Sequence, residues 1–353
     1  MTQPLSITMT QQPAYDGRLA KLVELNNARG MRVTLMDIGA TWLSCQVPVS
    51  QEESREVLLG VSTMADFMRQ QCYMGATIGR YANRIAHGRF TLQNQTFQVS
   101  TNQAGHCLHG GQQGFDKRRW HIAVKSEQSV TFSLLSPDGD QGFPGNLTVH
   151  VTYTLTNDNQ VTIHYRATTD RATPVNLTNH AYFNLQGEQP VPDCRSHFIK
   201  IAAEQYLPIN AEGIPLGHLQ AVAGSALDLR AQAQIGERLL CEPQQMAVKG
   251  FDHCYLFASG RKLSEPVAEV VSADQKVRML VTTDKPAMQL YTGNWLAGTP
   301  DRSGGTYQDY AGLALETQFY PDSPNHEEWT QSDCILHPRQ EYVFNTGYQF
   351  VVA

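Results

Sequence analysis

Strict alternation of apolar and polar residues is the feature of this sequence that most limits its possible fold. The apolar positions of the clearest run are Leu147, Val149, Val151, Tyr153 and Leu155. Because successive side chains of a strand point to opposite faces, this run predicts a β-strand with one buried face. A second alternating run at 161–167 follows Asn157-Asp158-Asn159, and since these residues favour tight turns, the two runs predict a hairpin.

Similar alternation recurs along the chain, whereas helical periodicity is scarce. Two short segments favour a helix, 64–70 after the capping residue Thr63, and 231–240. Many strands without a regular strand–helix alternation indicate an all-β fold, a large antiparallel β-sandwich. No linker-like stretch divides the 353 residues, so we expect 1–353 to form a single domain. Further strands are expected near 31–37, 90–99, 130–136, 197–203, 267–272 and 277–283.

Composition and charge argue against several classes of protein. Apolar residues make up 41% of the chain and charged residues 17%, which suits a folded core. The net charge of -6 gives no electrostatic reason to bind nucleic acid. No apolar run approaches the roughly 18 to 20 residues of a membrane span, and the start of the chain lacks the pattern of an export signal. Seven scattered cysteines without a C-x-x-C pair suit free thiols, so we expect a cytoplasmic protein.

The common motifs for nucleotide binding and for serine nucleophiles are absent from the sequence. It contains no G-x-x-x-x-G-K-[ST], no G-x-G-x-x-G and no G-x-S-x-G. Two imidazoles and a thiol occur together at His106, Cys107 and His109, a set that could bind a soft divalent metal. A spacing of three residues would splay the two rings in a loop or strand, however, which favours ordinary loop histidines or a substrate contact by His109.

Short blocks that mix aromatic and hydrogen-bonding residues point to a hydroxyl-rich ligand. Sugars pack their C–H faces on aromatic rings, and their hydroxyls bond to Arg, His and Asn side chains and to carboxylates. Taken singly, His180 is also consistent with a buried core histidine, and Glu316 with a charge at a strand edge. The blocks lie at 81–85, 108–111, 179–187, 251–257, 290–295 and 313–326.

Taken together, these blocks resemble the aldose 1-epimerases, also called galactose mutarotases. The resemblance runs from about residue 15 to 350. It implies a one-domain β-supersandwich that needs no cofactor and interconverts the α and β anomers of aldohexoses such as galactose and glucose. The matching stretches are GATIGRYANRIAHGRF at 75–90, LHGGQQGFDKRRW at 108–120, GDQGFPGNL at 139–147, NLTNHAYFNLQG at 176–187 and ETQFYPDSPNH at 316–326.

The resemblance also implies roles for individual residues. Glu316, in L-E-T-Q, is expected to be the general base, and His180, in N-H-x-Y-F-N-L, the general acid. One departure is visible, because the family commonly has Asn at the place of His106, which bears on the local loop geometry and on sugar preference. The sugar-binding residues implied by the resemblance are Asn83, Arg84, His109, Tyr182, Asp252 and Gln289.

A carboxylate and an imidazole suit this reaction on chemical grounds. A hemiacetal ring opens when a base removes the proton of the anomeric hydroxyl while an acid protonates the ring oxygen. Rotation about C1–C2 and reclosure then give the other anomer, and no metal or nucleotide is required. The unperturbed pKa of histidine, about 6.5, lies near cellular pH, and we expect a neighbouring carboxylate to keep more of His180 protonated.

Three other functions are consistent with parts of the same pattern. A non-catalytic carbohydrate-binding sandwich would need no acid–base pair, and a glycoside hydrolase would need two carboxylates, with Asp252 as the second. A hexose-phosphate 1-epimerase of the same fold could bind phosphate through Lys117-Arg118-Arg119, although such a basic run is more often a solvated surface. We expect a monosaccharide as the partner, no nucleic acid or membrane, and a monomer or weak homodimer.

Overall fold

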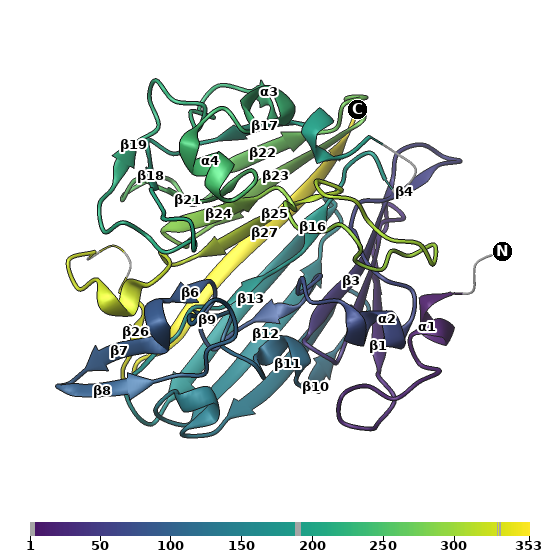
Figure 1. Cartoon of the computed structure of the whole chain (residues 1–353). Coiled ribbons are helices and arrows are strands. Elements are labelled where there is room, and N and C mark those ends of the chain that lie inside the picture. Colours follow the sequence, from purple (N-terminus) through teal and green to yellow (C-terminus); the bar gives the residue numbers. More distant parts are fainter. Residues whose placement is uncertain (1–3, 188–191, 330, 332) are drawn as a thin grey trace.

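The regular secondary structure consists mostly of antiparallel β-sheets, as the computed structural model shows for residues 4–187, 192–329, 331 and 333–353 (Figure 1). Two of these sheets are large, with nine and six strands. In Figure 1 the long strand β27 crosses the middle of the nine-stranded sheet, and a smaller sheet of β1 to β4 lies to one side. The expected all-β antiparallel fold is confirmed.

The sheets contain the following strands, given from edge to edge. The nine-stranded sheet consists of β10 (His121–Lys125), β11 (Ser129–Ser136), β12 (Leu147–Leu155), β13 (Gln160–Thr169), β27 (Tyr342–Val352), β23 (Val277–Thr283), β22 (Ala268–Val271), β17 (Phe198–Ile201) and β20 (Ala233–Gln234). The six-stranded sheet consists of β16 (Tyr182–Phe183), β25 (Leu313–Gln318), β24 (Ala287–Tyr291), β21 (Asp252–Leu256), β18 (Gln205–Leu207) and β19 (Gln220–Ala221). The four-stranded sheet consists of β1 (Leu22–Asn26), β2 (Arg32–Met36), β3 (Thr41–Pro48) and β4 (Ser54–Glu56). The isolated pairs are β14 (Thr173–Pro174) with β26 (Ile335–Leu336), β15 (Thr178–Asn179) with β5 (Thr77–Ile78), β6 (Arg84–Ile85) with β9 (Cys107–Leu108), and β7 (Arg89–Leu92) with β8 (Gln95–Gln98).

The helices are short and lie in the connections. The expected helix after Thr63 is confirmed as α2, and the Thr63 hydroxyl accepts a hydrogen bond from the backbone N–H of Asp66 at 3.1 Å, which caps the first turn. The α-helices are α1 (Leu5–Thr8), α2 (Met64–Arg69), α3 (Ile235–Arg238) and α4 (Pro243–Ala247). The 3₁₀ turns are η1 (Ala86–Gly88), η2 (Phe115–Lys117), η3 (Asp140–Gly142), η4 (Cys194–Ser196) and η5 (Ser323–Asn325).

The alternating runs form the core of the nine-stranded sheet. β12 and β13 pair as the expected hairpin, and Asn159 in the connecting turn adopts a φ of 58°, which asparagine tolerates better than most residues. Each fully buried large apolar side chain contributes roughly 1.5–3 kcal/mol to folding, so the buried side chains of β12 and β13 are a major source of stability. The buried positions of the two strands include Leu147, Val149, Val151, Tyr153, Leu155, Val161, Ile163, Tyr165 and Ala167.

The six-stranded sheet packs against the nine-stranded sheet through β25 and β27. The Tyr348 hydroxyl on β27 donates to the carbonyl of Leu315 at 2.9 Å, and the hydroxyls of Thr317 and Thr346 lie 2.5 Å apart. Leu315 and Thr317 therefore face the large sheet. Since side chains alternate along a strand, Glu316 between them faces the opposite way.

The expected boundaries of two elements are wrong. The segment 90–99 is a hairpin of β7 and β8, because Gln93 and Asn94 both adopt positive φ, 52° and 60°, and reverse the chain. The segment 231–240 is helical only over Ile235–Arg238. Its first part pairs with β17 as the edge strand β20, and this pairing competes with helix formation.

Candidate active site

One wall of the site is a single face of the six-stranded sheet. Gln289 on β24 lies opposite Glu316 on β25, and Asp252 on β21 lies opposite Tyr291 on β24. Tyr182 on β16 joins the edge of the same sheet beside β25. Because these positions have the same parity along paired strands, their side chains gather on the face that points away from the nine-stranded sheet.

The opposite wall is held by the short strands β6 and β9. The backbone N–H of Asn83 donates to His109 Nδ1 at 3.0 Å, and the backbone N–H of His109 donates to the carbonyl of Asn83 at 3.0 Å. Gly110 has a φ of +87°, and a Cβ at this position would lie 2.1 Å from the carbonyl oxygen of Gly79. Only glycine fits there, which explains the glycine that follows His109 in L-H-G-G.

The segment after β25 binds the strand that carries Arg84. The backbone N–H of Asp322 donates to the carbonyl of Arg84 at 2.8 Å, and the Asp322 carboxylate accepts from the N–H of Ala86 at 2.9 Å. The Tyr81 hydroxyl donates to the carbonyl of Tyr320 at 2.8 Å. The motifs A-N-R-I and L-E-T-Q, far apart in the sequence, are therefore parts of one bonded unit.

The structure brings His180 and Glu316 together. His180 Nε2 lies 3.5 Å from Glu316 Oε1, and the two side chains are only 5% and 3% exposed. Among the described residues, His180 Nδ1 and Glu316 Oε2 have no hydrogen-bond partner. A buried polar atom without a partner is costly, so such atoms at the end of a cavity mark a place where a ligand is expected to bind.

Burial moves the pKa values of this pair in opposite directions. It raises the pKa of Glu316 to about 8, with the charge of Asp252 adding to the effect and Arg84 opposing it. It lowers the pKa of His180 to about 4, although Asp252 acts in the other direction. Near neutral pH the pair thus holds one proton, on Glu316. A neighbouring carboxylate, Asp252, does raise the His180 pKa, but desolvation outweighs it, so the expectation that His180 is kept protonated is wrong.

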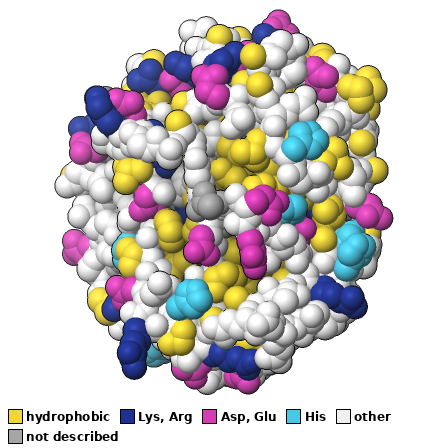
Figure 2. Space-filling model, turned by 90° about the vertical axis from the view of Figure 1, so that its left-hand side faces the viewer, with side chains coloured by type: hydrophobic (Ala, Val, Ile, Leu, Met, Phe, Trp, Pro, Cys, Tyr) yellow, Lys and Arg dark blue, Asp and Glu magenta, His cyan; other side chains and the backbone are white. Residues whose placement is uncertain are grey.

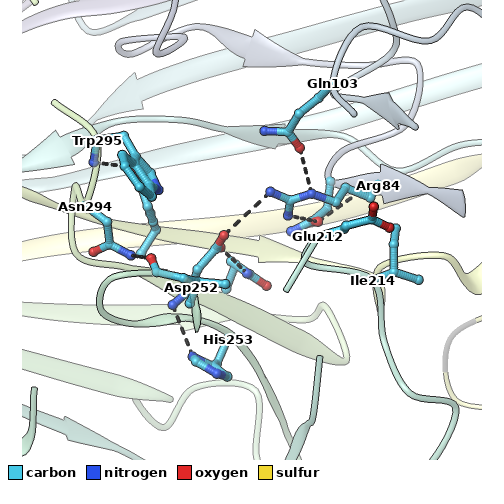
Figure 3. Close-up of polar contacts among 12 residues, drawn as sticks. Arg84, Gln103, Glu212, Ile214, Asp252, His253, Asn294 and Trp295 are labelled. Atoms are coloured by element: carbon cyan, nitrogen blue, oxygen red, sulfur yellow. Dashed lines mark hydrogen bonds and ion pairs between the residues drawn. The ribbon is translucent and has the colours of Figure 1, made fainter. Parts of the chain in front are cut away.

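Four of the residues expected to bind sugar are joined by hydrogen bonds and one ion pair, and Figure 3 shows the contact between Arg84 and Asp252 at the centre of this network. Arg84 Nε donates to Gln103 Oε1 at 2.8 Å, and a terminal nitrogen of Arg84 lies 3.6 Å from the carboxylate of Asp252. Gln289 Nε2 donates to the same carboxylate at 2.6 Å. Asn83 Oδ1 accepts from the backbone N–H of Arg84 at 2.9 Å. The guanidinium and the carboxylate are thus held in place before any ligand binds.

His109 presents a hydrogen-bond donor to the site. Because its Nδ1 accepts from a backbone N–H and burial lowers its pKa well below the usual value, the ring is neutral and Nε2 carries the hydrogen. Ligand atoms of His109, His180 and Glu316 lie within 4.8 Å of one another, but an N–H donor suits a sugar hydroxyl rather than a metal ion. His106 points elsewhere, to Glu212 at 3.1 Å, so the H-C-L-H run does not converge on one ion.

These residues surround a cavity of about 950 Å³, at the upper end of the range of small-molecule sites. Gln289 is the exception among the expected site residues, since it does not line the cavity and acts behind Asp252. The expected residues that line the cavity are Asn83, Arg84, His109, His180, Tyr182, Asp252 and Glu316.

Four aromatic residues that line the cavity were not assigned from the sequence, namely Tyr15, Tyr73, Tyr291 and Trp295. Tyr73 adopts a φ of 60°, and its ring centroid lies 4.7 Å from that of His109 and 5.9 Å from that of His180, on which it stacks. Trp295 is exposed at the rim, and its backbone N–H donates to the Tyr291 hydroxyl at 3.1 Å. The L-Y-T-G-N-W block contains Tyr291 and Trp295, whereas Tyr15 and Tyr73 lie outside every block and carry no sequence signal.

The chain is similar to proteins with one kind of activity. A family described as "Aldose 1-epimerase" matches residues 21–349. The chain is 49% identical over 338 residues to an aldose 1-epimerase of Escherichia coli (strain K12), covering 96% of this chain and 97% of that relative. It is 40% identical over 324 residues to the galactose mutarotase of Rattus norvegicus, covering 92% of each. A solved aldose epimerase homologue from C. elegans superposes with a TM-score of 0.85 at 27% identity, covering 95% of this chain and 99% of that one.

Proposed function

The chain belongs to the aldose 1-epimerase family and interconverts the α and β anomers of aldoses, and we propose that Glu316 and His180 move the protons in this reaction. The observation that carries this proposal is the 3.5 Å separation of their facing atoms at the buried end of the cavity. Each can reach the same bound ring there, and together they hold one proton near neutral pH.

Ring opening moves two protons, and the pair supplies one acceptor and one donor. Glu316 takes the proton of the anomeric hydroxyl while His180 gives a proton to the ring oxygen, and the bond between C1 and the ring oxygen breaks to leave an aldehyde. Because the proton of the pair resides on Glu316 before sugar binds, this scheme requires that it move onto His180 when sugar binds. After rotation about C1–C2 the two groups exchange roles and the ring closes as the other anomer.

The residues that we propose to bind the sugar match a set of hydroxyls. Arg84 and His109 present donors into the cavity, and Asp252 presents an acceptor. Tyr182 offers a ring on which the C–H face of the sugar can pack. Gln289 fixes the Asp252 carboxylate from behind. The full proposed set is Asn83, Arg84, His109, Tyr182, Asp252 and Gln289.

Two observations favour an unphosphorylated sugar as substrate, and we propose aldohexoses such as galactose and glucose. Arg118 of the basic run pairs with Asp140 at 2.8 Å, and Arg119 pairs with Asp16 at 2.6 Å. Lys117 lines the cavity, but its Nζ donates to a backbone carbonyl at 2.7 Å. The basic run is therefore engaged within the protein rather than presented to a phosphate.

A hydrolytic role for Asp252 as a second carboxylate receives little support from its surroundings. Its two oxygens are engaged by Gln289 at 2.6 Å and by Arg84 at 3.6 Å, which suits a residue that orients hydroxyls. A non-catalytic binding module would not need the unpartnered atoms of His180 and Glu316 at the end of the cavity. Both features favour the epimerase reaction.

We also propose a cellular location, a domain organisation, an oligomeric state and a class of partner for the protein. We propose a cytoplasmic enzyme with one domain, 1–353, that acts as a monomer or weak homodimer on a monosaccharide and does not bind nucleic acid. The seven free cysteines support a reducing compartment. On the face shown in Figure 2, Lys and Arg side chains are scattered towards the edge while acidic and hydrophobic side chains occupy the middle. In the described part of the chain, no helix has the length and apolar character needed to cross a membrane.

Polarimetry tests the proposed substrates directly. Freshly dissolved α-glucose and α-galactose relax to a final optical rotation, and a catalytic amount of the protein is expected to speed the approach without changing the end point. Heat-denatured protein is the control. Acceleration of neither sugar would contradict the proposal, as would release of reducing sugar from a glycoside at a comparable rate.

A further inference from the structure

His106 is a buried histidine beside the cavity that the proposed chemistry does not use. Its side chain is 2% exposed. Its Nδ1 accepts a hydrogen bond from the backbone N–H of His87 at 2.9 Å. A neutral imidazole has one donor and one acceptor nitrogen, so this bond leaves the hydrogen on Nε2.

The donor nitrogen of His106 reaches a residue that lines the cavity. Nε2 lies 3.1 Å from Glu212 Oε2. Glu212 belongs to a tight turn in which the Asn210 side chain accepts from the backbone N–H groups of Glu212, at 2.9 Å, and Ile214, at 3.0 Å. These bonds brace the turn internally, and among the described residues the hydrogen bond to His106 ties it to the wall that carries Arg84 and His109.

This turn lies directly on Arg84. Gly213 has a φ of +77°, and a Cβ there would lie 2.7 Å from Arg84 Cζ, so the backbone of the turn touches the guanidinium. Gln103 and Asp252 contact the same guanidinium from other sides (Figure 3). Glu212 and Gly213 themselves line the cavity. The position of the turn therefore affects both the shape of the rim and the position of Arg84.

We propose that His106 and Glu212 form a clasp that positions the turn 210–214 against Arg84 and thereby sets the affinity of the site for sugar. This inference rests on the proposed function. His106 is a positioning residue in this scheme and takes no part in proton transfer. Because Arg84 holds hydroxyls that do not react, its contacts are equally strong in the ground state and the transition state. Loosening the clasp therefore raises KM and leaves kcat nearly unchanged.

Three variants test the clasp. Glu212→Ala removes the acceptor, and His106→Asn removes the Nε2 donor while its side-chain oxygen still accepts from the N–H of His87. The third variant combines both changes. Since a hydrogen bond of this kind contributes about 1 kcal/mol, each single change is expected to raise KM for galactose about fivefold, with kcat within about twofold. The double variant is expected to match the single ones, because either change already opens the clasp.

Two further variants separate positioning from general damage. His106→Gln carries an amide nitrogen near the place of Nε2 and is expected to restore most of the affinity. Glu265→Ala is the control, because Glu265 is exposed and pairs with Lys262 at 3.3 Å within its own loop. This change is expected to leave KM unaltered. Glu212 is 55% exposed, so its removal is not expected to prevent folding.

The outcomes distinguish a failed clasp from a failed function. If the wild-type protein is active and Glu212→Ala leaves KM unchanged, the clasp is overturned. The clasp is also overturned if the effects of the two single changes on KM add in the double variant. If the wild-type protein does not speed mutarotation, the proposed function fails, and calorimetric titration with galactose still tests the clasp. A dissociation constant about fivefold higher in Glu212→Ala supports it. An equal constant, or no binding by the wild-type protein, overturns it.

Discussion

Glu316 and His180 lose hydration together, and this shared burial sets the pH range in which the pair holds one proton. With pKa values of about 8 and about 4, both groups are protonated below the lower value and no base remains. Above the upper value both are deprotonated and no acid remains. We expect the polarimetric rate, corrected for spontaneous mutarotation, to be level between these limits and to fall on both sides. A single limb centred at the ordinary histidine value of 6.5 would contradict this account.

Asp252 contributes to both of these pKa values, and this offers a second test at the level of single residues. Its negative charge raises the pKa of Glu316 and of His180. In Asp252→Asn, both limbs of the pH–rate profile are expected to move to lower pH. KM is expected to rise about tenfold or more, since a charged acceptor for a hydroxyl is lost.

The matched control for this substitution is Asp158→Asn. Asp158 is exposed and lies 3.6 Å from Arg29, away from the residues that line the cavity. It is expected to leave both limbs and KM unchanged. Limbs that stay in place in Asp252→Asn would show that Asp252 does not act on the pair through its charge.

At the same scale, the sequence identified polar residues of the site better than aromatic ones. His180, Glu316 and Arg84 lie in blocks with a recognisable mixture of residue types. Tyr73 contacts two site histidines but lies in an irregular segment without such a mixture. The direction of the His180 pKa shift could not be predicted from the sequence, because the burial of this side chain depends on packing among segments distant in the chain.

At the level of elements, the connection after β9 should tolerate no side chain at Gly110. A Cβ there would meet a backbone oxygen at 2.1 Å, so Gly110→Ala must shift the loop that carries His109. We expect a loss of about 1–3 kcal/mol in the free energy of unfolding from backbone strain. We also expect a fall of about 10²-fold in kcat/KM, because His109 is displaced from the bound sugar.

Gly260→Ala is the control for this prediction. Gly260 also has a positive φ, +81°, but a Cβ there meets nothing within 4 Å, and it does not line the cavity. This substitution should introduce backbone strain without displacing the loop that carries His109. The free energy of unfolding measured in urea should therefore fall, while kcat/KM stays unchanged. Equal losses of kcat/KM in the two variants would contradict the role given to the Gly110 contact.

Strands with one buried face were predictable from the sequence, and strands buried on both faces were not. β11, β12, β13 and β23 alternate clearly and match the expected positions. β25 is buried at every position, since one face packs on the large sheet and the other lines the cavity, so its sequence shows no period of two. The strand that carries Glu316 was therefore not among the expected strands. The split of 90–99 into two strands depended on two residues in the left-handed conformation.

At the scale of the whole molecule, the contact between the two large sheets lies directly behind the site. Tyr348→Phe removes the hydroxyl that bonds to the carbonyl of Leu315, the neighbour of Glu316. Because this buried carbonyl then loses its partner, we expect the free energy of unfolding to fall by about 1–3 kcal/mol. Urea denaturation measures the change.

Tyr15→Phe is the control, since Tyr15 is exposed and its hydroxyl lies 3.5 Å from the carbonyl of Met68. It should change stability by about 0.5 kcal/mol or less. Equal losses in the two variants would show that the hydroxyl of Tyr348 does not stabilise the contact between the sheets.

The carboxylate of Glu316 and the imidazole of His180 come from distant segments that only the complete fold brings together, and the proposed chemistry depends on this meeting. Polarimetry of Glu316→Gln with α-galactose, together with calorimetric titration of the same sugar, tests it most directly. We expect turnover to fall at least about 10²-fold while the dissociation constant stays within about tenfold of the wild-type value. Turnover equal to that of the wild-type protein would remove Glu316 from the reaction and contradict the account.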